Sequence, residues 1–131
     1  MFILKKFILN SFEALYFKIR LSFRTPIFSN NTLYISGQVA LDPKNGKMIN
    51  KSLDDETNQV MNNLKAILKE VGFDFNNVIK STIYLTNMEN FDEVNKIYGS
   101  FFDGNNVPAR VTVEVSRLPK DAKVEIDMIA S

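Results

Sequence analysis

Residues 106–131 read NVPARVTVEVSRLPKDAKVEIDMIAS, and this stretch decides the expected fold. Arg110, Thr112 and Glu114 alternate with valines, which is the period-two pattern of a half-buried strand. After the SRLPKDA segment the alternation resumes, with apolar residues on both sides of Glu125 and Asp127. The pattern predicts two strands joined by a turn at Pro-Lys-Asp, which share one apolar face and one polar face.

The polar face of this hairpin holds an arginine and a carboxylate. Reflection about the turn near Leu118 and Pro119 sets Glu125 roughly opposite Thr112, one diagonal step from Arg110. We therefore expect Arg110 and Glu125 on one face, or meeting across a subunit boundary in an oligomer. The same residues could form an ordinary exposed ion pair, so alternation alone does not decide between chemistry and structure.

The composition excludes several classes of function. The 131 residues are 45% hydrophobic and 24% charged, as expected for a single globular domain. Sixteen basic and fifteen acidic residues give a net charge of +1, so no overall electrostatic footprint for nucleic acid exists. Histidine and cysteine are both absent, which rules out a Ser-His-Asp triad, a thiolate nucleophile and a His- or Cys-ligated metal. Catalysis must use carboxylates, Arg, Lys, Tyr, hydroxyls, backbone groups or water.

Residues 1–24 differ from the rest of the chain. They are dense in Phe, Ile and Leu and hold one acidic residue, Glu13. Their apolar runs are too short for a membrane span. A first strand or helix, a targeting leader and an incorrect start of the gene are the alternatives for this divergent segment. We expect residues 25–131 to form the domain, in the cytoplasm, or in an organelle if the segment is a leader.

The middle of the chain alternates strands and helices. A strand over 32–41 contains Gly37, which suggests a bulge or a close backbone approach. Strong turn residues at 42–46 precede a short returning strand over 47–50. Ser52 is a typical N-cap for a helix that Gly72 ends.

A strand over 78–85 and a second helix over about 91–102 follow. The order ββαβαββ predicts an α+β fold with both helices on one face of a mixed or antiparallel sheet. The other face would expose apolar residues, which oligomerisation would bury.

A set of short motifs in order along the chain, from about Leu33 to Ser131, resembles the RidA (YjgF) family. The motifs are Ser36-Gly-Gln38, Asp42-Pro-x-x-Gly46, Asn63-Leu-Lys-Ala-Ile67, Val78-x-Lys80, Val94-Asn95, Pro108-Ala-Arg110, Arg117-Leu-Pro-Lys120 and Val124-Glu-Ile126. The resemblance implies the chorismate-mutase-like fold and a homotrimer with sites between adjacent subunits. It also implies hydrolysis of 2-iminobutanoate and 2-iminopropanoate to 2-oxo acids and ammonia, with no metal or cofactor.

The resemblance also assigns roles to residues. Arg110 would clamp the substrate carboxylate, a task that suits a guanidinium fork. Glu125 would orient or activate water for attack on the imine carbon, as a carboxylate with a raised pKa can do. Ser36, Gly37 and Asn95 match further binding positions, whereas Lys80 and Arg117 are interpreted as interface or surface charges.

Two positions depart from the family pattern. Thr112 stands where many members have a cysteine, so a reactive thiol is excluded, although its hydroxyl can still hydrogen-bond a substrate. Phe23 stands where the family tyrosine is expected, so the ring can wall the pocket but its hydroxyl is missing. The alternatives to the deaminase are a non-catalytic trimer that binds small molecules or acts as a chaperone, and an endoribonuclease or translation inhibitor. The near-neutral charge and the absence of histidine disfavour the last.

Overall fold

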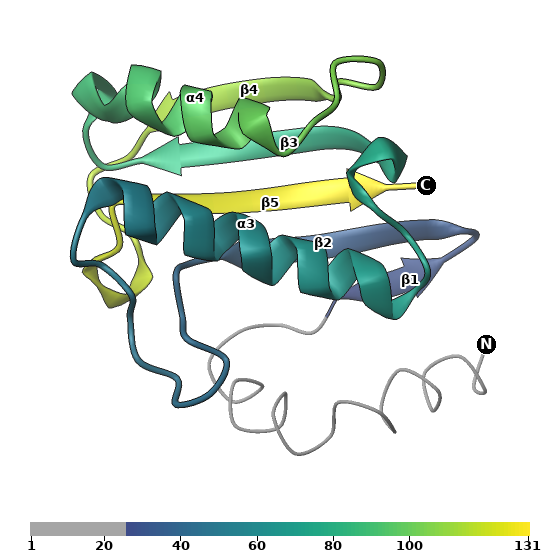
Figure 1. The fold of residues 1–131 in the computed structure, drawn as a ribbon, viewed down its shortest axis with the longest axis horizontal. Coiled ribbons are helices and arrows are strands. Elements are labelled where there is room, and N and C mark those ends of the chain that lie inside the picture. Colours follow the sequence, from purple (N-terminus) through teal and green to yellow (C-terminus); the bar gives the residue numbers. More distant parts are fainter. Residues whose placement is uncertain (1–25) are drawn as a thin grey trace.

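A computed structural model describes residues 26–131, which form one mixed sheet covered on one face by two helices (Figure 1). The elements are β1 Ile27–Ser29, β2 Thr32–Gln38, α3 Leu53–Glu70, β3 Val78–Leu85, α4 Phe91–Ser100, β4 Ala109–Glu114 and β5 Val124–Ala130. The strand order is β1-β2-β5-β3-β4, in which only β3 and β4 are parallel. The expected α+β class, ββαβαββ order and one-sided helix layer are confirmed.

The signals at the ends of α3 act as the sequence predicts. The Ser52 side chain accepts a hydrogen bond of 3.0 Å from the backbone N–H of Asp55, which satisfies one of the free donors of the first turn. Three acidic residues follow in that turn and complement the helix dipole. Gly72, at a φ of +76°, lies just beyond the end of the helix, where a residue with a side chain would be strained.

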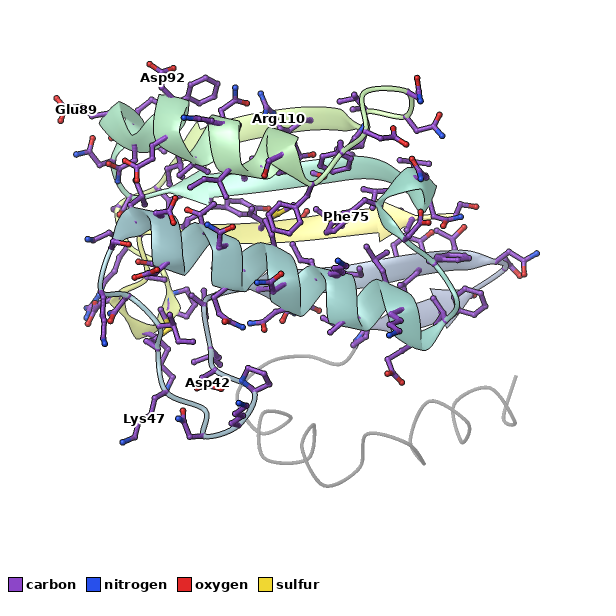
Figure 2. All side chains as sticks on the ribbon, viewed as in Figure 1. Asp42, Lys47, Phe75, Glu89, Asp92 and Arg110 are labelled. Carbon is purple, nitrogen blue, oxygen red and sulfur yellow. The ribbon has the colours of Figure 1, made fainter. Side chains whose placement is uncertain are left out.

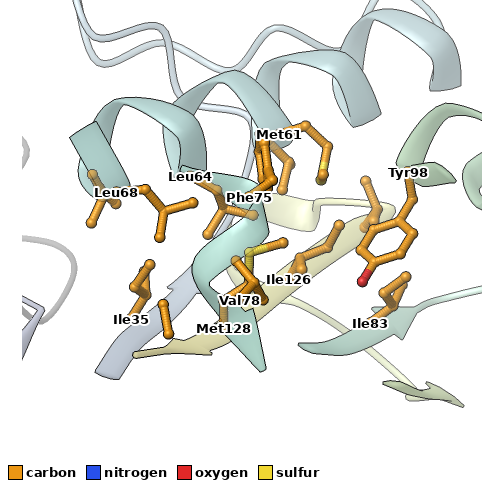
Figure 3. Close-up of a cluster of buried hydrophobic side chains, with 14 of the residues drawn as sticks. Ile35, Met61, Leu64, Leu68, Phe75, Val78, Ile83, Tyr98, Ile126 and Met128 are labelled. Atoms are coloured by element: carbon orange, nitrogen blue, oxygen red, sulfur yellow. The ribbon is translucent and has the colours of Figure 1, made fainter. Parts of the chain in front are cut away.

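The core lies between the helices and the sheet (Figure 3). Met61, Leu64 and Leu68 of α3 point down onto Ile126 and Met128 of β5. All five side chains are fully buried, so each contributes about 1.5–3 kcal/mol of favourable transfer free energy. Because these residues of the central strand β5 face the helices, the residues that alternate with them face the opposite side of the sheet.

The first two strands differ from the expectation. The strand expected over 32–41 ends at Gln38, after a register shift between Ile35 and Gln38 that confirms the bulge around Gly37. The returning strand expected over 47–50 is only a single bridge between Leu41 and Met48. The first strand of the ββ pair is β1, which turns back into β2 through two residues of positive φ.

The predicted closing hairpin is wrong. β4 pairs in parallel with β3, while β5 lies between β2 and β3 and does not contact β4 in the sheet. Arg110 and Thr112 are therefore in register with the buried residues Ser81 and Ile83, on the helix face. Alternation shows that a strand has two faces, but it does not identify the neighbouring strand, and a loop with turn residues can cross over a strand.

The face away from the helices, called the open face below, carries exposed apolar side chains, as the sequence predicts. Ile27, Tyr34, Val111 and Val113 are 60%, 50%, 45% and 36% exposed. Clusters of this kind mark surfaces that bind other molecules. Within residues 26–131, no helix combines the length and the apolar character that a membrane crossing requires.

Candidate functional site

Arg110 lies on the helix face of the edge strand β4, under α4 (Figure 2). Its Nη1 donates a hydrogen bond to Oδ1 of Asn95. Its guanidinium carbon is 5.8 Å from the ring centre of Phe91 and 5.2 Å from that of Tyr98, within the range of cation–π attraction. One amide and two rings therefore orient an exposed guanidinium, and the remaining N–H groups can bind an anion.

Helix α4 supplies all three of these partners from one face. Phe91, Asn95 and Tyr98 are spaced four and three residues apart, which places them on adjacent turns of the same side. Tyr98 is anchored below by a 2.9 Å hydrogen bond from its hydroxyl to Oγ of Ser81. Burial raises the pKa of the Tyr98 hydroxyl, against smaller lowering effects from Ser81 and Arg110. Tyr98 is therefore a neutral wall of the arginine site at physiological pH.

Thr112 follows Arg110 by two residues on the same face of β4. Its hydroxyl oxygen is shielded from solvent and has no hydrogen-bond partner among residues 26–131. Buried hydroxyl groups usually have a hydrogen-bond partner. A ligand or water bound beside Arg110 would supply one for Thr112.

Glu125 lies on the open face of β5, directly over Gly37 of β2. A β-carbon built on Gly37 would stand 1.8 Å from Oε1 of Glu125 and 2.7 Å from its Cδ. Glycine therefore allows the carboxylate to occupy the space that a side chain at position 37 would fill. Ser36 precedes it in the same bulge, and its carbonyl accepts a 3.0 Å hydrogen bond from Nε2 of Gln38.

The surroundings of Glu125 favour its protonated form. The side chain is half-buried, and burial raises the pKa of its carboxyl, with a further increase from the negative charge of Asp127. Tyr84 is opposite Glu125 in the register, and its hydroxyl donates a 2.8 Å hydrogen bond to Oδ2 of Asp127. Burial and that bond raise the pKa of the Tyr84 hydroxyl.

The structure brings the predicted residues together as two groups. Arg110, Asn95 and Thr112 form one group on the helix face, and Gly37 and Glu125 form the other on the open face. The expected diagonal contact between Arg110 and Glu125 is absent, because β3 lies between their strands and they point to opposite sides.

The remaining predicted positions add little. Phe23 lies outside the described residues. Lys80 is exposed, and Arg117 forms an exposed ion pair of 2.7 Å with Asp121, in keeping with surface charges. Residues 26–131 contain no group of three or more acidic, His or Cys side chains arranged to hold a metal ion.

Sequence reasoning missed Phe91, Tyr98, Tyr84 and Asp127 as neighbours of the site residues. Helical spacing from Asn95 would have found the two rings on α4, since all three share a side. Period two from Glu125 identifies Asp127 as its neighbour on one face. No sequence signal pairs Tyr84 with Asp127, since that contact depends on β5 lying beside β3.

The chain matches the family model described as endoribonuclease L-PSP over residues 19–131. It is 48% identical over 104 residues to a RutC family protein of Pyrococcus horikoshii, covering 79% of this chain and 82% of that protein. It is also 46% identical over 101 residues to a 2-iminobutanoate/2-iminopropanoate deaminase of mouse, covering 77% and 74%.

Solved structures agree with this relationship. A Rid family protein of Yersinia pestis is 42% identical with a TM-score of 0.79, and the match covers 81% of this chain and 84% of that one. The YjgF gene product of E. coli is 36% identical with a TM-score of 0.75, covering 80% and 84%. The order of strands, the one-sided helices and these similarities together show that the chain belongs to the RidA (YjgF) family.

Proposed function

We propose that this protein hydrolyses small 2-imino acids to 2-oxo acids and ammonia. The observation that carries the proposal is the pair of prepared groups: a guanidinium oriented by Asn95 and two rings, and a half-buried carboxylate over Gly37. The first suits a carboxylate and the second suits proton transfer, which are the two requirements of this substrate. The mouse relative named as such a deaminase supports the same reaction class.

The proposed reaction uses water and no cofactor. Arg110 binds the substrate carboxylate, with Thr112 donating to or accepting from the substrate or its water. The reaction starts from the protonated imine: Glu125 takes a proton from water while the water oxygen bonds to the imine carbon, and the C=N electron pair moves to nitrogen, which leaves a neutral carbinolamine. Glu125 then returns this proton to the nitrogen, and the C–N bond breaks to release ammonia. The C=O bond forms as the hydroxyl proton passes to solvent.

We infer from the opposite orientation of the two groups that a complete site takes one group from each of two copies of the chain. The helix-face group of one copy would meet the open-face group of a neighbour, and closed rotation would give the proposed homotrimer. The exposed apolar residues of the open face support such packing.

A coupled assay tests the activity. Threonine dehydratase supplies the imine, and release of 2-oxobutanoate is followed with and without the protein. Acceleration is expected, with loss in Arg110→Ala and most of that loss in Arg110→Lys, because an ammonium cannot form the paired hydrogen bonds of a guanidinium. Folded protein that gives no acceleration would contradict the deaminase proposal.

A mixing experiment tests the shared site. Arg110→Ala and Glu125→Gln chains should each be inactive, but their co-refolded mixture should recover about one quarter of wild-type activity if each site takes one group from each of two copies. Separately refolded chains, mixed afterwards, are the control. If wild-type protein is active and the co-refolded mixture is not, the two groups do not act together across copies.

A further inference from the structure

A second carboxylate lies beside Glu125 and has its own anchor. Asp127 of β5 accepts the 2.8 Å hydrogen bond from the Tyr84 hydroxyl of β3, and both side chains are half-buried. In the register, Tyr84 is opposite Glu125, whereas Asp127 is opposite Thr82. The Tyr84 side chain therefore reaches diagonally across the open face and holds Asp127 in place.

The anchored charge is close enough to act on Glu125. Residues two apart in a strand share a face, and their Cα atoms are about 6.6 Å apart, so their side-chain charges interact where water is partly excluded. Burial is the main cause of the raised pKa of Glu125, and Asp127 is the next. Tyr34 and Lys80 also lie on this face, beside Ile129, which is two residues beyond Asp127 and four beyond Glu125.

The hydrogen bond matters because a free aspartate would not keep this position. An unanchored surface carboxylate samples several rotamers, and solvent and salt then screen its charge. The helix-face group around Arg110 does not depend on the Tyr84–Asp127 hydrogen bond, since that group lies on the opposite face of the sheet. The bond therefore acts on the open face, where Glu125 lies.

We propose that Asp127 is a positioning residue of the imine hydrolysis, anchored by Tyr84 so that its negative charge favours a proton on Glu125. Glu125 then takes a proton from water more readily than an isolated carboxylate does. This inference rests on the proposed function for its purpose. The interaction of the three side chains, however, can be measured without any substrate.

The test follows the Glu125 carboxyl carbon by NMR in full-length protein labelled at glutamate, with Glu125→Gln assigning its signal. Asp127→Asn should move the titration midpoint of Glu125 to lower pH, because the nearby charge is lost. Asp127→Glu should keep the midpoint near the wild-type value, because it retains the charge. Tyr84→Phe should give an intermediate midpoint, because the charge remains but its anchor is lost.

Two results would overturn the inference. An unchanged midpoint in Asp127→Asn means that Asp127 does not act on Glu125, and a wild-type midpoint in Tyr84→Phe means that the anchor has no part. In the activity assay, the acidic limb of the profile of kcat/KM against pH should move with the midpoint across these variants. A decrease of kcat/KM that is equal at every pH in these variants indicates that Asp127 and Tyr84 have only a structural role. Absence of imine hydrolysis would refute the proposed function while leaving the titration result standing.

Discussion

Gly37→Ala should separate activity from stability. The added β-carbon would stand 1.8 Å from Oε1 of Glu125, and ordinary contact begins at 3.4 Å, so the carboxylate must retreat by about 1.6 Å. The obstacle is the end of a flexible side chain, and turning it from its rotamer costs about 0.5–1.5 kcal/mol. We therefore expect a small decrease in the free energy of unfolding, measured by urea denaturation at fixed protein concentration.

The effect of Gly37→Ala on activity should be much larger. A general base must lie within hydrogen-bond reach of its proton, and a displacement of about 1 Å can lower a rate about 100-fold. We expect kcat/KM for imine hydrolysis to fall by roughly that factor or more. Gly99→Ala is the matched control, since Gly99 lies in α4 with nothing within 4 Å of an added β-carbon and should be neutral or slightly stabilising.

Two outcomes would refute this reasoning. Wild-type kcat/KM in Gly37→Ala, together with a loss in Glu125→Gln, would show that the position of the carboxylate over Gly37 is not the active one. A decrease of kcat/KM in Gly99→Ala as large as that in Gly37→Ala would show that an added methyl group acts by some route other than Glu125.

Three further predictions concern stability, each measured by urea denaturation. Glu56 is fully buried, its Oε1 accepts a hydrogen bond from the N–H of Lys123, and its Oε2 has no partner among residues 26–131. Glu56→Gln keeps an oxygen acceptor for the N–H of Lys123 and should change stability little, whereas Glu56→Ala leaves this buried amide without a partner and should cost about 2–3 kcal/mol; equal losses in the two variants would contradict this. Glu125→Gln should stabilise the fold at pH 7 but not below pH 4.5. The pKa of Glu125 is raised in the folded protein, so the wild type loses stability as pH rises through this pKa and the carboxyl ionises. A gain in stability of Glu125→Gln that persists in acid would refute the raised pKa. Tyr98→Phe removes the buried bond to Ser81 and should cost about 1–2 kcal/mol near pH 7. The pKa of the Tyr98 hydroxyl is raised above 10.0, so the stability that its hydrogen bond adds is present below pH 10.0 and is lost as pH rises through the raised pKa. Tyr98→Phe should therefore lose less stability than the wild type as the solution becomes alkaline. A parallel loss in both proteins would contradict this.

Local signals in the sequence predicted the elements well and their neighbours poorly. Ser52 and Gly72 bound the first helix because capping and positive φ act within a few residues. The placement of β5 between β2 and β3 depends on packing over the whole chain, and alternation at Val111 and Glu125 has the same appearance in a hairpin and in two separated strands.

The same distinction explains the site. The family motifs identified Arg110, Asn95, Gly37 and Glu125, and the structure groups Arg110 with Asn95 and Gly37 with Glu125. The expected contact between Arg110 and Glu125 failed because it assumed a hairpin. Tyr84 could not be assigned, since its bond to Asp127 joins residues 43 positions apart in the chain.

The position of β5 in the sheet has a consequence for biosynthesis. β5 follows β1, β2, β3 and β4 in the chain, yet within residues 26–131 it is the strand that joins the β1–β2 pair to the β3–β4 pair. While the chain is being translated, these pairs have no shared strand, and their apolar faces stay open to chaperones. Closure must await the emergence of Val124–Ala130 from the ribosome exit tunnel, so a stalled nascent chain lacking this segment should remain protease-sensitive.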